Sequence, residues 1–266
     1  CDPGCFIEYG ALAIAAQRGR RSEEDLVSKT PADGLIAGVG SVNGSLFSED
    51  RARCMVMSYD YTVLAGTQGF FNHKKMDRML HLAQEQHLPL VFFAEGGGGR
   101  PGDIDAQGVM VAGLDLPTFG LFAGLSGSVP MVGVVSGYCF AGNAALLGCC
   151  DVIIATANSS IGMGGPVMIE GGGLGVFKPE DVGPMNVQTQ NGVVDIEAAD
   201  DDEAVSLAKK YLSYFQGATT SWEEGDQLKL RSLIPESRKR AYHVPVSYTH
   251  LRAHETVLDL VCSLLL

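Results

Sequence analysis

The sequence describes an acidic chain of ordinary globular composition. Its 266 residues include 19 Lys and Arg against 31 Asp and Glu, a formal charge of −12, and 46% are hydrophobic. This length is enough for a buried core, and this composition excludes a disordered chain or a coiled coil. The negative charge repels phosphate backbones and offers no basic face, so neither nucleic acid nor a membrane surface is predicted as a partner.

The seven cysteines lie mostly inside apolar runs and show no disulfide-framework spacing. This usage predicts a reducing, cytoplasmic setting. The adjacent Cys149 and Cys150 lack a CxxC partner and are interpreted as small core residues. His250 and His254 are four residues apart and could face one metal ion, but no third ligand is evident, so no metal site is predicted.

Short apolar runs alternate with segments of helical periodicity, which is typical of an α/β protein. Within 72–87, for example, Met76, Met79, Leu80 and Ala83 fall on one helical face. Asn191-Gly192 predicts a hairpin turn that leads into residues 193–196. Strands are expected over 34–39, 54–58, 89–94, 131–136 and 151–157, and helices over 72–87, 107–125, 142–149 and 203–214.

The stretch 116–169 carries a single formal charge, at Asp151. Pro117, Pro130 and repeated glycines break this stretch, so it predicts strands and helices buried on both sides rather than a membrane span. Its apolar character also leaves open a non-enzymatic interpretation. In that case the chain would be an incomplete, non-catalytic scaffold with an apolar dimer face.

Two glycine-bearing loops follow predicted strands. Residues 97–102 formally match GxGxxG, but Pro101 removes a backbone donor and acidic residues follow, so a dinucleotide site is only weakly indicated. The second loop runs from Ser136 to a helix that starts near Gly142. Backbone N–H groups of both loops could meet at one oxygen that becomes negative in a transition state. Tight helix–sheet packing would explain the same glycines.

Four stretches in consistent order resemble one enzyme family. They are DYTVLAGTQG at 60–69, FAEGGGGR at 93–100, GYCFAGNA at 137–144 and NGVVD at 191–195. Together they resemble the N-terminal half of the carboxyltransferase subunits or domains of biotin-dependent acyl-CoA carboxylases, of the acetyl-, propionyl- and methylcrotonyl-CoA type. The resemblance implies a crotonase (ClpP-like) fold, which is an α/β spiral of ββα units.

The resemblance also divides the chain. Residues 34–242 are expected to form the acyl-CoA-binding N-terminal domain of a carboxyltransferase, without its biotin-binding half. Residues 1–33 are expected to be a truncated N-terminal segment. Residues 243–266 resemble a translated sequencing-adapter read-through and are interpreted as a non-native tail.

By resemblance, the backbone oxyanion donors are Gly98, Gly99 and Gly142. Related hydratases use two glutamates whose positions are here occupied by Ala145 and Gly165, so no side-chain acid or base is expected. Lys74 and Lys75 are possible contacts to CoA phosphates, although solvated charges on a helix face explain them equally well. The expected substrate-binding residues are Gly97, Arg100, Ala141, Asn143, Lys74 and Lys75.

The activity that the resemblance implies is carboxyl transfer from carboxybiotin to the α-carbon of an acyl-CoA, through an enolate held at the oxyanion donors. Biotin would sit on a partner carrier domain, and no metal is expected in this domain. The implied partners are the biotin carboxyl carrier and biotin carboxylase, with a homo-oligomer in the full enzyme. The fragment is expected to be inactive alone. The corresponding half of a biotin-dependent acyl-CoA decarboxylase is the alternative.

Overall fold

The computed structural model describes residues 1–106 and 116–218, together with residues 228, 231, 235–237 and 239–240. The chain divides into a compact unit, Cys1–Gly217, and a second unit, Ala218–Leu266. The boundary predicted at residue 34 falls inside the first unit. The predicted tail 243–266, with His250 and His254, lies outside the described residues, as do residues 107–115 of one predicted helix.

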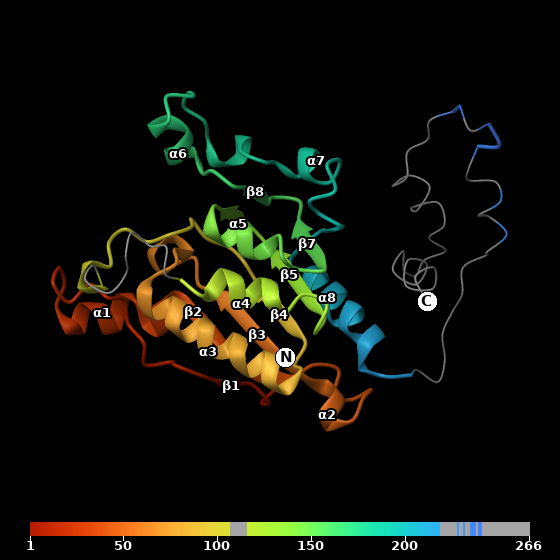
Figure 1. Ribbon diagram of the computed structural model, residues 1–266, viewed down its shortest axis with the longest axis horizontal. Coiled ribbons are helices and arrows are strands. Elements are labelled where there is room, and N and C mark those ends of the chain that lie inside the picture. Colours follow the sequence, from red (N-terminus) through yellow and green to blue (C-terminus); the bar gives the residue numbers. More distant parts are fainter. Residues whose placement is uncertain (107–115, 219–227, 229–230, 232–234, 238, 241–266) are drawn as a thin grey trace. The chain divides into compact units, whose positions relative to one another are not determined.

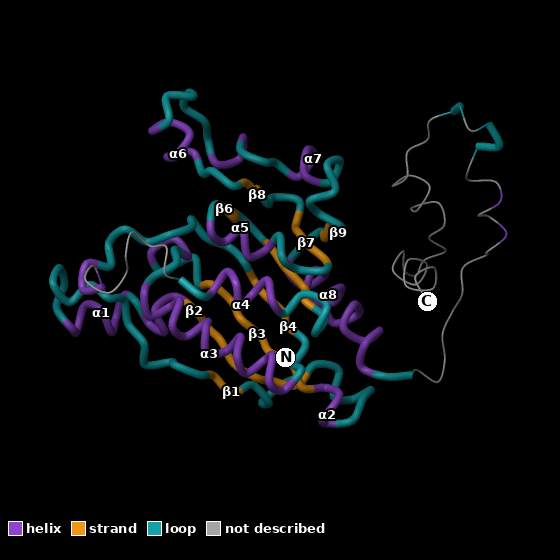
Figure 2. The backbone as a smooth tube through the Cα atoms, in the orientation of Figure 1, coloured by secondary structure: helices purple, strands orange, loops and turns teal. Residues whose placement is uncertain are grey.

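A mixed seven-stranded sheet forms the centre of the first unit (Figures 1 and 2). The described strands of the whole unit, two of which lie outside this sheet, are β1 (Ile7–Glu8), β2 (Leu35–Ser41), β3 (Arg53–Tyr59), β4 (Leu90–Phe93), β5 (Met131–Val135), β6 (Tyr138–Phe140), β7 (Val152–Thr156), β8 (Ser160–Gly162) and β9 (Ile196–Ala198). The sheet order is β1-β2-β3-β4-β5-β7-β9, antiparallel from β1 to β3 and parallel from β3 to β9. Strands β6 and β8 form a separate parallel pair.

Helices cover both faces of this sheet. The helices are α1 (Glu23–Lys29), α2 (Glu49–Ala52), α3 (Phe70–Gln86), α4 (Thr118–Gly124), α5 (Gly142–Leu147), α6 (Pro166–Gly171), α7 (Met185–Gln188) and α8 (Asp201–Gln216), with short 3-10 turns at Pro31–Gly34, Leu64–Gly66, Ile104–Ala106 and Pro179–Asp181. Among the described helices, none is long and apolar enough to cross a membrane.

The core lies between the sheet and helix α3, as the helical periodicity predicts. Met76, Met79, Leu80 and Ala83 are all buried in the same cluster as Phe92. The Phe92 ring meets Tyr59 and Phe122 edge-on, with centroids 5.8 and 5.1 Å apart. Successive strand residues point to opposite faces, so Val91 and Phe93 lie with Ala208 and Leu212 of α8 on the other side.

The expected α/β class and most expected elements are confirmed, including β5 and β7, both buried strands of the stretch 116–169. The predicted hairpin after Asn191-Gly192 is wrong. Strand β9 pairs parallel with β7, and Asp195 exchanges hydrogen bonds with the backbone of Ile153 at the start of that ladder. An Asn-Gly pair indicates only a local reversal of the chain. Which strand β9 pairs with depends on the edge that β7 offers in the folded sheet.

Candidate functional site

The two predicted loops meet at the carboxyl-end edge of the parallel sheet. Strands β4 and β5 are parallel neighbours, so the segments that follow them leave the sheet at the same edge. The Gly96 N–H donates to the Tyr138 carbonyl at 2.8 Å, and the Phe140 N–H donates to the Gly96 carbonyl at 2.8 Å. The glycine loop (residues 96–99) is therefore tied to β6, the strand that leads into α5.

The helix elbow (Ala141 and Gly142) joins β6 to α5 in a strained conformation. Ala141 has φ 53° and ψ −120°, a region that costs a non-glycine residue about 1–3 kcal/mol. Gly142 follows as the first residue of α5, where a backbone N–H has no partner within the helix. Among the residues that the structure describes, no acceptor bonds the Gly142 N–H. The strained residue, Ala141, therefore directly precedes a backbone N–H that has no acceptor in the described part of the chain.

The glycine loop holds one further open donor. The Gly97 N–H donates to the Ala65 carbonyl at 3.1 Å, and the Gly98 N–H donates to Asn143 Oδ1 at 3.0 Å. The Gly99 N–H has no acceptor within the described part of the chain, and a methyl group at Gly99 would meet no atom within 4 Å. A methyl group at Gly98 would lie 3.3 Å from the Gly142 nitrogen, so the two loops are in contact.

Two buried residues, Asn143 and Gln68, hold the glycine loop in place by hydrogen bonds. Asn143 is 0% exposed, and its Nδ2 donates to the Gly66 carbonyl at 3.3 Å. The Gln68 backbone brackets the glycine loop, accepting from the Arg100 N–H and donating to the Gly98 carbonyl at 2.7 Å. A Cβ at Gly142 would overlap Gln68 Oε1, so a larger residue there would require the Gln68 side chain to move. Gln68 lies in a stretch that carries the family resemblance, but sequence reasoning gave it no role.

The Arg100 side chain faces inward. The side chain is 4% exposed, and its guanidinium pairs with Asp33, lies 3.6 Å from Asp103 and donates to the Thr67 carbonyl at 2.7 Å. Burial raises the pKa of Asp33, and the Arg100 charge opposes that rise. The guanidinium predicted to bind substrate is therefore held inside the fold, where its charge is already paired.

The neighbouring lysines of α3 point to different environments. The Lys75 ammonium is buried, donates to the Leu35 carbonyl and lies 3.5 Å from Glu8. Burial lowers its pKa. Lys74 is exposed, and its ammonium lies 5.8 Å from the centre of the Phe70 ring. Of the two predicted phosphate contacts, only Lys74 presents its charge to solvent.

Glu95 links the ends of two strands and was missed by sequence reasoning. Its carboxylate accepts a hydrogen bond from the Ser136 N–H, which joins the segment after β4 to the segment after β5. Burial raises the pKa of this carboxyl. A lone glutamate in a glycine-rich stretch carries no signal of such a contact, because its partner is 41 residues away.

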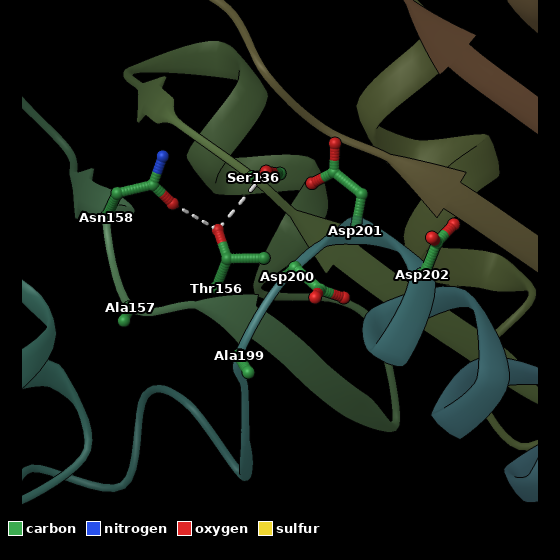
Figure 3. Close-up of a pocket in the computed structure, with 8 residues that line it drawn as sticks. All are labelled: Ser136, Thr156, Ala157, Asn158, Ala199, Asp200, Asp201 and Asp202. Atoms are coloured by element: carbon green, nitrogen blue, oxygen red, sulfur yellow. Dashed lines mark hydrogen bonds between the residues drawn. The ribbon is translucent and has the colours of Figure 1, made fainter.

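A separate pocket of about 550 Å³ opens near the ends of β5, β7 and β9 (Figure 3). Thr156 Oγ1 lies 3.2 Å from Ser136 Oγ there, and the start of α8 supplies the acidic wall. None of the predicted site residues lines it, and its carboxylates would repel a phosphate. The lining residues are Ser136, Thr156, Ala157, Asn158, Ala199, Asp200, Asp201 and Asp202.

Residues 1–248 match the carboxyl transferase domain family. The mitochondrial methylcrotonoyl-CoA carboxylase beta chain of Dictyostelium discoideum is 27% identical over 216 residues, 78% of this chain and 33% of that protein. A solved single-chain, multi-domain long-chain acyl-CoA carboxylase is 61% identical, with a TM-score of 0.81, over 92% of this chain and 24% of that one. The hexameric transcarboxylase 12S, solved with methylmalonyl-CoA, is 26% identical, with a TM-score of 0.68, over 93% of this chain and 47% of that one.

The chain spans between about a quarter and a half of the length of these three proteins. Both solved structures cover more than 90% of this chain, with TM-scores of 0.81 and 0.68. They confirm the expected crotonase-like fold.

Proposed function

The chain belongs to the carboxyl transferase domain family, and on that premise we propose that it is the acyl-CoA-binding half of a biotin-dependent carboxyltransferase. The observation that carries the proposal is the contact between the glycine loop and the helix elbow. This contact brings two open backbone donors, Gly99 and Gly142, to one edge of the sheet. Paired N–H donors of this kind suit an acyl thioester oxygen.

These donors would act when the thioester loses its α-proton. The resulting enolate carries negative charge on the former carbonyl oxygen, and preorganised N–H groups stabilise that charge without rearranging. Removing one such donor costs about 3 kcal/mol of transition-state stabilisation in other enzymes. Ala145 and Gly165 offer no acid or base, so in this proposal the chain binds and polarises the thioester while the proton is taken elsewhere.

Biotin, bound to a carrier outside this chain, would supply the carboxyl group. The donors that this chain offers are neutral N–H groups, which fit an enolate oxygen or a ureido oxygen equally well. Ala141 directly precedes Gly142, and Gly97 lies two residues before Gly99, so both would border the acyl group. Lys74 is the remaining candidate for a CoA phosphate because its ammonium is exposed.

The partners follow from the same proposal. Residues 34–242 would form the acyl-CoA domain, and the biotin-binding half, a biotin carrier and a biotin carboxylase would complete the reaction. The chain would then be inactive alone, and the complete enzyme would be an oligomer, as the hexameric transcarboxylase 12S is. The six described cysteines are all free, which supports a reducing, cytoplasmic location.

Calorimetry tests the binding claim directly. The full chain is titrated with acetyl-CoA and propionyl-CoA, and with free CoA as the matched ligand that lacks the thioester oxygen. We expect both thioesters to bind more tightly than CoA, because only they reach the open donors. A folded chain that gives no heat with any of the three ligands at millimolar concentration contradicts the proposal.

A further inference from the structure

We propose that Asn143 is a positioning residue that fixes the glycine loop and the helix elbow relative to each other. The proposal deepens the proposed function and rests on it. Asn143 is the second residue of α5 and directly follows Gly142. Its side chain is completely buried, and both ends of its amide are bonded to backbone groups of other segments.

One amide bonds two segments that lie far apart in the sequence. Asn143 Oδ1 accepts from the Gly98 N–H at 3.0 Å, and Nδ2 donates to the Gly66 carbonyl at 3.3 Å. The space for a side chain at Gly96 is taken up by Asn143 Nδ2 and the Gly66 carbonyl. Glycine at position 96 thus makes room for the amide, and the three segments close around it.

This bond decides which N–H of the glycine loop remains open. The Gly98 N–H is occupied by Asn143, so Gly99 supplies the donor that pairs with Gly142. Because Asn143 is covalently next to Gly142, its bond to Gly98 fixes the spacing between the two donors. The side chain is completely buried and both ends of its amide bond the backbone, so its role in this proposal is to position the donors rather than to bind substrate.

The chemistry of the site explains why an amide is suited to this place. An asparagine side chain offers one acceptor and donors together, which the Gly98 N–H and the Gly66 carbonyl both require. An aspartate could accept from Gly98 but could not donate to Gly66. Its negative charge beside the donors would also oppose the charge that builds up on the enolate oxygen.

The test compares Asn143→Ala with Gln216→Ala. Gln216 is a matched control because its buried amide also bonds backbone carbonyls, those of Val42 and Arg51, at the end of α8. Thermal unfolding first shows that both variants fold. The readout is the infrared carbonyl stretch of acetyl-CoA labelled with ¹³C at the thioester, bound to the full chain, with calorimetric affinities for acetyl-CoA and CoA.

In the wild type we expect a lowered carbonyl stretch, which reports hydrogen bonding to the thioester oxygen. Asn143→Ala should lose this shift, and its preference for acetyl-CoA over CoA should fall by about five- to tenfold, the worth of a hydrogen bond of roughly 1 kcal/mol. Its affinity for CoA should stay unchanged. Gln216→Ala should keep both the shift and the preference.

A folded Asn143→Ala that keeps the full shift and preference overturns the positioning role and leaves the proposed function standing. The same role is overturned if Gln216→Ala loses the shift as well, because general loosening then explains the loss. A wild type that binds no acetyl-CoA overturns the proposed function itself. If Asn143→Ala does not fold, Asn143→Ser takes its place, since its shorter side chain cannot span both partners, and the same loss is expected.

Discussion

Two neighbouring regions of this protein surround the glycine loop with opposite chemistry. On one side, the helix elbow and the Asn143 amide contact the loop through neutral groups and leave two N–H donors open. On the other side, the buried charge cluster (Asp33, Arg100 and Asp103) anchors the chain that leaves the loop. The difference shows that a charged side chain near a site need not bind the ligand, because it can be paired within the fold. Here the charges hold the backbone, and the proposed site uses the backbone N–H groups.

The largest effect is expected in the buried charge cluster. Arg100→Met leaves the Asp33 carboxylate buried without its partner, which costs about 3–5 kcal/mol of unfolding free energy. Urea unfolding of the variant measures this loss. Lys29→Met is the control, because the Lys29–Asp25 pair is exposed and is worth at most about 1 kcal/mol. Equal losses in the two variants would show that Arg100 does not stabilise the loop from inside.

The next comparison uses the adjacent lysines of α3. Lys75→Met removes the ammonium that bonds the Leu35 carbonyl, and we expect a loss of about 1–3 kcal/mol of unfolding free energy. Lys74→Met should change stability by less than about 0.5 kcal/mol because Lys74 is exposed. Denaturant unfolding and CoA calorimetry on both variants measure this contrast. Weaker CoA binding in Lys74→Met alone would support its proposed phosphate contact.

A stabilising change is expected in the helix elbow. Ala141→Gly relieves the conformation at φ 53° and ψ −120°, and we expect a gain of about 1 kcal/mol after the entropy cost of glycine. Differential scanning calorimetry would record a higher unfolding temperature. Ala145→Gly, within α5 itself, should instead lose about 1 kcal/mol. A loss in both variants would mean that the elbow stores no strain.

The smallest expected effect is a pH dependence at His73. Thr118 donates to Asp77, so it accepts from His73 Nδ1, and burial lowers the pKa of this imidazole to about 4. The folded chain therefore binds fewer protons than the unfolded chain between pH 6.5 and 4, and stability is lost as pH falls through that range. Between pH 7 and 6 the loss is about 0.7 kcal/mol.

His73→Gln should remove this part of the pH dependence in urea unfolding measured at both pH values. His81→Gln, an exposed histidine on the same helix, is the matched control and should keep the wild-type dependence. An unchanged slope in His73→Gln would show that His73 does not contribute to it.

The sequence by itself determined the class of the fold, most of its elements and the family. Apolar periodicity is a local signal, and α3 begins only two residues before its predicted start, at Phe70. Glycines that follow predicted strands likewise marked the two loops, because glycine lets a backbone approach another segment closely.

Only the tertiary structure decided which groups are occupied and which are open. The partner of Asn143 is 45 residues away and that of Arg100 is 67 residues away, so neither bond leaves a pattern in the local sequence. The same holds for the parallel pairing of β9 with β7. Arg100 and Lys75 were both predicted to contact substrate, and the fold buries them instead, because burial depends on neighbours that distant segments supply.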